Sequence, residues 1–241
     1  VPSTWPRFGH EPCTLIPVEI EGSVYTRYAT GETTTSGYRG LDGCARALSG
    51  VLAGRRGKSL TYVYLPQLDT LLHLRGSADR DVASLLARLD GFVESMAGEL
   101  AGKARLVVMA DHGQTDVPRE NLVMLGADDP SGRLLSTQPS GEARVPYFHV
   151  SEGSERVFAG LFRERYGQLF ALLTPGEVEE LQLLGPGPLD SRLRPRLGSF
   201  VGISPVAAKV YAEPFHADSI AHVGAHGGLL PAEMRIPLVV V

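Results

Sequence analysis

Cysteine is scarce in this sequence, and its two cysteines do not define a site. Cys13 and Cys44 lie far apart and have neither a metal-binding nor a redox spacing. We therefore expect two small buried apolar side chains and no disulfide framework. Because disulfides belong to oxidising compartments, this favours a cytoplasmic over a secreted protein. The first residues do not read as a signal peptide, and the lack of an initial Met suggests a fragment or a processed product.

Long apolar runs and an excess of positive charge are also lacking. No apolar stretch approaches the roughly 18 residues of a membrane-spanning helix, so no such span is expected. The net charge is −4 and no block of Lys or Arg stands out, which gives no support to nucleic-acid or membrane-surface binding. The 241 residues are 43% hydrophobic and 21% charged, enough for the core of one large domain or two small ones.

The alternation of helical and strand-like segments predicts an α/β fold. Apolar side chains recur at helical spacing over residues 41–52 and, most clearly, over 82–100. Short apolar runs at 59–65 and 105–109 are expected to form buried strands. A strand, a long helix and another strand form a βαβ unit, which implies a mostly parallel sheet flanked by helices. We expect residues at about 130–215, which include two Gly- and Pro-containing stretches, to form a small inserted α+β segment. Within it, Thr174-Pro-Gly-Glu177 predicts the start of a helix that ends near Gly185.

The first cluster that carries chemistry is Asp69-Thr-Leu-Leu-His73. Side chains four residues apart on a helix face the same way, and zinc-binding helices use similar spacings. Taken alone the pattern is weak, because surface pairs with this spacing are common. Its position strengthens it, since it follows an apolar strand and so lies where α/β proteins place their ligands.

The second cluster is Asp111-His112-Gly113, which directly follows the apolar run 106–109. A carboxylate oxygen and an imidazole nitrogen at one point suit a divalent cation such as Zn²⁺. Gly113 would allow a sharp backbone turn beside the site. The alternative is that Asp111 caps a helix and leaves His112 exposed.

The third cluster is His226-Gly-Gly, before the closing apolar strand at 236–241. His216 and His222 lie nearby in the sequence and compete for the same role. Because each cluster flanks a predicted strand, we expect all three at one sheet. Together they offer ligands for two zinc-like ions, which could clamp the entering and leaving oxygens of a phosphoryl transfer.

The order and spacing of these clusters are specific when they are taken together. They resemble the type I phosphodiesterase/nucleotide pyrophosphatase branch of the alkaline phosphatase superfamily over roughly residues 14–241. The motifs that carry the resemblance are Tyr64-Leu-Pro-Gln-Leu-Asp69-x-x-x-His73-x-x-Gly76, Val108-Met-Ala-Asp111-His112-Gly113, and His226-Gly-Gly with Glu233-Met-x-Ile-Pro-Leu, joined by Ser140-Gly-Glu-x-Arg144 and residues 162–167.

The resemblance implies an alkaline phosphatase-like α/β domain that hydrolyses phosphodiester or nucleotide pyrophosphate bonds of small phosphate-ester or nucleotide substrates. Asp69, His73 and His226 would hold one Zn²⁺, and Asp111 and His112 would hold part of a second. In the family a Thr or Ser attacks phosphorus, forms a covalent phospho-enzyme and is then freed by water.

The family's nucleophile, and one more metal-binding Asp, belong to a strand and helix N-terminus that precede everything seen here. We therefore expect both upstream of Val1, and this chain alone to be inactive. The Thr-rich residues 33–36 match a nucleophile motif in letters, but they follow Tyr25-Thr-Arg27, which the family has after its nucleophile. A polar loop is the favoured interpretation of 33–36, and we expect the whole Thr/Ser/Gly-rich segment 30–40 to be a loop.

Two other functions stay open at the level of the sequence. One is another reaction of the same superfamily, carried out by a phosphomonoesterase, a sulfatase or a phosphonate hydrolase. The other is a module that binds metal and phosphate without catalysis.

Overall fold

The structure is a computed structural model that describes residue 5 and residues 11–31, 33–54 and 57–241. The chain forms two compact units. The first consists of residues 1–68, 83–106 and Val241, and the second of residues 69–82 and 107–240. All five candidate metal ligands therefore belong to the second unit.

The first unit contains a three-stranded parallel sheet with the order β2-β1-β3. The central strand β1 aligns Cys13 with Thr34 of β2 and with Thr61 of β3. This confirms a parallel sheet flanked by helices. The elements up to the long helix are β1 (Glu11–Pro17), α1 (Val18–Glu21), α2 (Val24–Thr30), β2 (Thr34–Tyr38), α3 (Gly40–Gly54), β3 (Ser59–Val63), α4 (Gln67–Arg75) and α5 (Arg80–Leu100).

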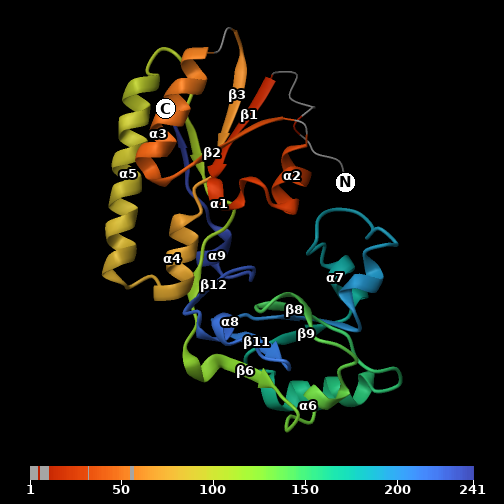
Figure 1. The fold of residues 1–241 in the computed structure, drawn as a ribbon. Coiled ribbons are helices and arrows are strands. Elements are labelled where there is room, and N and C mark those ends of the chain that lie inside the picture. The colour runs from red at the N-terminus through yellow and green to blue at the C-terminus, as the bar shows by residue number, and fades with distance from the viewer. Residues whose placement is uncertain (1–4, 6–10, 32, 55–56) are drawn as a thin grey trace. The chain divides into compact units, whose positions relative to one another are not determined.

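One face of this sheet is covered by α3 and α5 (Figure 1). Leu15 of β1 packs with Cys44 and Leu48 of α3 and with Met96 of α5. These helices present the apolar stripes that the sequence predicts, and burial of such side chains is the main force that holds the layers together. Cys13 and Cys44 are both free and buried, as expected.

The second unit is built around an antiparallel sheet of order β7-β8-β10-β9, and three two-stranded pairs, β11-β6, β12-β5 and β13-β4, accompany it. Only β11 and β6 among these pairs run parallel. The strands are β4 (Val107–Met109), β5 (Thr115–Asp116), β6 (Leu122–Leu125), β7 (Ser140–Glu142), β8 (Val145–Phe148), β9 (Ala171–Leu173), β10 (Phe200–Ile203), β11 (Lys209–Ala212), β12 (Gly224–Ala225) and β13 (Leu238–Val240). The helices are α6 (Glu155–Tyr166), α7 (Pro175–Glu180), α8 (Ala217–Ala221) and α9 (Pro231–Met234), with short 3₁₀ turns at Arg119–Asn121, Gly132–Leu134 and Arg194–Leu197.

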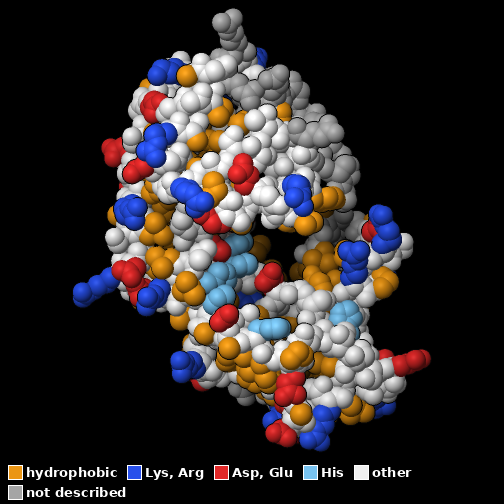
Figure 2. Space-filling view, in the orientation of Figure 1, with side chains coloured by type: hydrophobic (Ala, Val, Ile, Leu, Met, Phe, Trp, Pro, Cys, Tyr) orange, Lys and Arg blue, Asp and Glu red, His pale blue; other side chains and the backbone are white. Residues whose placement is uncertain are grey.

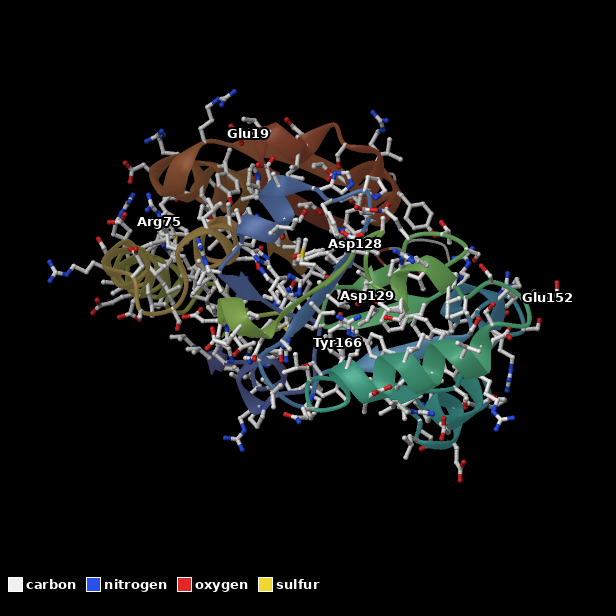
Figure 3. All side chains as sticks on the ribbon, turned by 90° about the horizontal axis from the view of Figure 1, so that it is seen from below. Glu19, Arg75, Asp128, Asp129, Glu152 and Tyr166 are labelled. Carbon is white, nitrogen blue, oxygen red and sulfur yellow. The ribbon has the colours of Figure 1, made fainter. Side chains whose placement is uncertain are left out.

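A cluster of phenylalanines forms the core of the second unit. The Phe148 ring of β8 lies 5.3 Å from Phe158 and 5.0 Å from Phe162 of α6, measured between centroids. All three side chains are fully buried, and tilted aromatic pairs at these distances add attraction to their burial. Beside this core, Tyr166 at the end of α6 donates a hydrogen bond of 2.6 Å to Asp129 (Figure 3).

The helix at 175 begins as the sequence predicts. Thr174 accepts a hydrogen bond from the backbone N–H of Glu177, whose carboxylate accepts one from the N–H of Thr174, while Pro175 occupies the first turn. This capping box satisfies backbone donors that a helix N-terminus otherwise leaves unpaired. The helix ends at Glu180, earlier than the expected end near Gly185.

Several expectations about local structure are wrong. Residues 30–40, expected as a loop, contain the strand β2, and α2 precedes it. Their Thr-rich composition looked polar, but β-branched Thr suits a strand. The run 105–109, expected as a buried strand, has Val107 and Met109 exposed by 50% and 63%, and its partner strand β13 is exposed as well.

The strands that flank the three clusters also belong to different hydrogen-bonded sheets, not to one: β3 pairs with β1, β4 with β13, and β12 with β5. The parallel pairs of the first unit join β1 to β2 and β3, so the βαβ unit expected at 59–109 is not what builds that sheet.

The inserted segment at about 130–215 and a cytoplasmic location stay predictions. Within the described ranges, every helix is too short or too polar to cross a membrane.

Candidate metal centre

Helix α4 carries Asp69 and His73 on one face. The helix ends where Gly76 adopts a left-handed φ of +79° and donates its N–H to the Leu72 carbonyl at 2.9 Å. Because the two residues are one helical turn apart, their side chains converge, and His73 Nε2 lies 3.5 Å from Asp69 Oδ1. The helical interpretation of Asp69-x-x-x-His73 is therefore confirmed.

His73 is held in place by the segment that leads to His226. The N–H of Val223 donates to the His73 carbonyl at 2.7 Å, and His73 Nδ1 lies 2.8 Å from the carbonyl oxygen of Gly224. This contact favours the tautomer with a proton on Nδ1, which leaves the lone pair of Nε2 for a metal ion. A side chain at Gly224 would come within 2.5 Å of the Leu72 carbonyl oxygen, so this close approach requires glycine.

His226 follows β12, which pairs with β5 in antiparallel register. Its Nε2 lies 4.0 Å from Asp69 Oδ1, and the donor atoms of Asp69, His73 and His226 all lie within 4.8 Å of one another. A tetrahedral Zn²⁺ with bonds of about 2.0–2.1 Å would place such donors about 3.3 Å apart. Small side-chain rotations would close the difference, so the donor set fits a zinc-like ion.

Two histidines at this cluster, His226 and His222, are shifted towards the neutral form that a metal requires. Burial, and next the neighbouring His112, lower the pKa of His226. Burial, and next His73, lower the pKa of His222. A neutral imidazole keeps a lone pair available for a cation without first losing a proton.

The structure also separates the competing histidines. His226 completes the three-residue group with Asp69 and His73. His222, at the end of α8, lies outside that group, with its ring centroid 4.9 Å from that of His73. His216 is exposed at the start of α8. Of the three, His226 is thus the one that faces the Asp69 carboxylate.

Gln114 is a site residue that the sequence reasoning missed. Its Nε2 donates to Asp69 Oδ1 and, at 3.2 Å, to the Asp69 backbone carbonyl. A hydrogen bond to one carboxylate oxygen fixes the orientation of the group. The available signal was position alone, since Gln114 directly follows the Asp111-His112-Gly113 motif.

Asp111 and His112 lie at the end of β4 next to this group. No helix begins at Asp111, so the alternative that it caps a helix is wrong. The His112 ring stacks on that of His226 with centroids 3.8 Å apart and an interplanar angle of 18°. Asp111 Oδ2 lies 3.7 Å from His112 Nε2, and its side chain is 75% exposed. The rings of neighbouring histidines here lie 3.8 to 5.0 Å apart between centroids, and Figure 2 shows a patch of histidine side chains with others apart from it.

Gly113 serves a different purpose from the expected sharp turn. Its N–H donates to the carbonyl of Glu233 at 2.7 Å, and a Cβ at this position would overlap the carbonyl oxygen of Ala232. Glycine is therefore required by the close approach of the segment that ends in α9.

The fold and the cluster of carboxylate and imidazole donors place this protein among α/β proteins with a candidate metal site. A model of the type I phosphodiesterase / nucleotide pyrophosphatase family matches residues 33–229. The chain belongs to this family. No curated protein matches the chain.

Several solved structures have a similar fold. Murine ectonucleotide pyrophosphatase / phosphodiesterase 5 superposes with a TM-score of 0.69 and 15% identity over 98% of this chain. The human protein of the same name gives 0.68 and 14% over 98%. Phosphonoacetate hydrolase from Sinorhizobium meliloti 1021 gives 0.62 and 14% over 98%, covering 66% of its own length. The chain spans 61% of the length of the two ectonucleotide pyrophosphatases, and its fold is of the alkaline phosphatase type.

Proposed function

We propose that this protein hydrolyses phosphodiester or nucleotide pyrophosphate bonds with the help of two divalent metal ions, for which Zn²⁺ suits the ligands best. The observation that carries the proposal is the convergence of Asp69, His73 and His226, whose donor atoms lie within 4.8 Å of one another. Membership of the type I phosphodiesterase / nucleotide pyrophosphatase family supports the reaction class.

Asp69, His73 and His226 would hold one ion, and Asp111 and His112 would supply part of a second site. Bound ions would neutralise the charge on the phosphate oxygens. The protein's own contribution is to orient the ligands: the Gly224 carbonyl directs Nε2 of His73 towards Asp69, and Gln114 holds the Asp69 carboxylate. The hydroxyl nucleophile implied by the family resemblance is proposed to lie before Val1.

Small phosphorus oxyanions are the substrate class we propose. An inactive form of the murine ectonucleotide pyrophosphatase was solved with AMP, and the Sinorhizobium phosphonoacetate hydrolase with phosphonoformate. Both ligands carry an anionic group on phosphorus, which is the group that a pair of divalent ions would bind. We extend this to a nucleotide or another phosphate ester for the present protein.

The reaction is tested by comparing two chromogenic esters in the presence of Zn²⁺. We expect the full-length natural protein to hydrolyse p-nitrophenyl thymidine monophosphate, a diester, faster than p-nitrophenyl phosphate, a monoester. A preference for the monoester would contradict the diesterase assignment and favour a phosphomonoesterase. Turnover of neither ester by a metal-loaded protein would favour a module without catalysis.

The ligand assignment is tested by His226→Ala, with His216→Ala as the matched control. His226→Ala should lower the zinc content measured by elemental analysis, because it removes one of three donors to the first ion. His216→Ala removes an exposed histidine and should leave the zinc content unchanged. Full zinc content in His226→Ala would refute this assignment and make His222 the candidate.

A further inference from the structure

A fully buried ion pair lies beside the candidate metal centre. The Arg144 and Glu233 side chains are 0% and 1% exposed, and Nε and Nη2 of the arginine contact Oε1 and Oε2 of the glutamate at 2.5 and 2.7 Å. Such a two-pronged contact is geometrically specific. Arg144 also donates through Nη1 to the carbonyls of Val206 and Ala208, at 3.0 and 2.8 Å, which anchors it to the chain before β11.

Glu233 also contacts both histidine-bearing segments. Its Oε1 accepts a hydrogen bond of 2.8 Å from the N–H of Gly228, two residues after His226. Its backbone carbonyl accepts one of 2.7 Å from Gly113, the residue after His112. One residue thus binds the backbone next to each of the two stacked imidazoles.

The glycines after His226 allow this contact. A Cβ on Gly228 would lie 2.8 Å from Arg144 Nε and from Glu233 Oε2, and one on Gly227 would lie 2.7 Å from Glu142 Cγ. The segment after His226 therefore lies directly against the ion pair, and any side chain at Gly228 would push it away.

We propose that Glu233 is a positioning residue, held by Arg144, that sets the separation of His226 from His112 and so the spacing of the two proposed metal sites. This rests on the function proposed above. A buried ion pair adds little net stability compared with an apolar replacement of the same shape. Its hydrogen bonds instead fix the two segments whose imidazole centroids lie 3.8 Å apart. Neither Arg144 nor Glu233 touches a metal ion in this account.

The test measures metal affinity, not activity. Zn²⁺ binding to the protein is followed by competition with a chromogenic chelator, and the visible absorption spectrum of the Co²⁺-substituted protein reports the ligand geometry. We expect Glu233→Gln and Arg144→Lys to weaken Zn²⁺ binding by about 10- to 100-fold, the usual effect of losing groups that orient metal ligands, and to change the Co²⁺ spectrum.

Asp129→Asn is the matched control. Asp129 is also a buried acid of the second unit in an ion pair, with Arg165 at 3.2 Å, and it lies outside the metal-ligand group. It should lower stability while leaving Zn²⁺ affinity and the Co²⁺ spectrum unchanged. A general effect of weakened folding would move all three variants together and would overturn the proposal.

The possible outcomes distinguish this inference from the proposed function. If the unmodified protein binds no Zn²⁺, both are wrong. If it binds Zn²⁺, and Glu233→Gln and Arg144→Lys bind within about twofold of it, the positioning role alone is wrong. If Glu233→Gln does not fold, Arg144→Lys, which keeps the positive charge but loses the paired geometry, decides the question alone.

Discussion

Gly113→Ala tests the closest backbone approach at the candidate metal centre. A Cβ at Gly113 would overlap the Ala232 carbonyl oxygen and lie 3.1 Å from its carbon. The two segments must separate to ordinary van der Waals distance, which breaks the 2.7 Å hydrogen bond from Gly113 to Glu233. Overpacking costs about 1–3 kcal/mol, and losing a hydrogen bond costs about 1 kcal/mol. We expect the free energy of unfolding to fall by about 2–4 kcal/mol.

The assay is urea denaturation of the metal-free protein, with Gly160→Ala as the control. Gly160 lies within α6, and a Cβ there would meet nothing within 4 Å. Since alanine favours a helix over glycine, Gly160→Ala should raise stability by about 0.5–1 kcal/mol. A Gly113→Ala protein whose stability lies within about 0.5 kcal/mol of the unmodified protein would refute the overlap argument.

Two further predictions concern the second unit. Asp129→Asn should destabilise the protein at pH 7 by about 2 kcal/mol, because an amide nitrogen would replace Oδ2, which accepts the hydrogen bond of Tyr166 and pairs with Arg165. Burial opposes the charge of Asp129, but hydrogen bonds from Ser131 and Tyr166 outweigh this and lower its pKa. That stabilisation is present above the pKa of about 3.9 that Asp has in the unfolded chain, and it is lost as the pH falls through the lower pKa of the folded state. The unfolding curves of variant and parent should therefore converge in acid. A difference in stability at pH 3 as large as at pH 7 would contradict this. Phe162→Ala should lower the free energy of unfolding by about 3–5 kcal/mol, because it opens a cavity in the phenylalanine core. Leu181→Ala truncates an exposed side chain and should change the melting temperature little. Equal losses of stability in the two variants would show that Phe162 is not part of the core.

Much of the local structure could be predicted because it depends on neighbours in sequence. The apolar periodicity at 82–100 predicts α5, and the spacing of Asp69 and His73 predicts that α4 brings their side chains together. The Thr174 capping box is likewise a short-range pattern. The strand β2 was missed because its Thr and Ser side chains look polar. Its hydrogen bonds come from pairing with β1, which the local sequence pattern does not reveal.

The assembly of the candidate site could be predicted only in part. Order and spacing pointed to Asp69, His73 and His226, but what joins them is the contact of His73 with Val223 and Gly224, which no local pattern encodes. The same holds for the Arg144–Glu233 pair, whose partners are distant in sequence and become neighbours only when the second unit folds. Tertiary hydrogen bonds of this kind require the folded backbone.

The most direct test of the central claim is a crystal of the protein grown with Zn²⁺ and measured at the zinc absorption edge. We expect an anomalous-scattering peak about 2.0–2.2 Å from Asp69 Oδ1, His73 Nε2 and His226 Nε2. A second peak beside Asp111 and His112 would support the two-ion proposal. No peak among Asp69, His73 and His226 in a zinc-containing crystal would contradict the account.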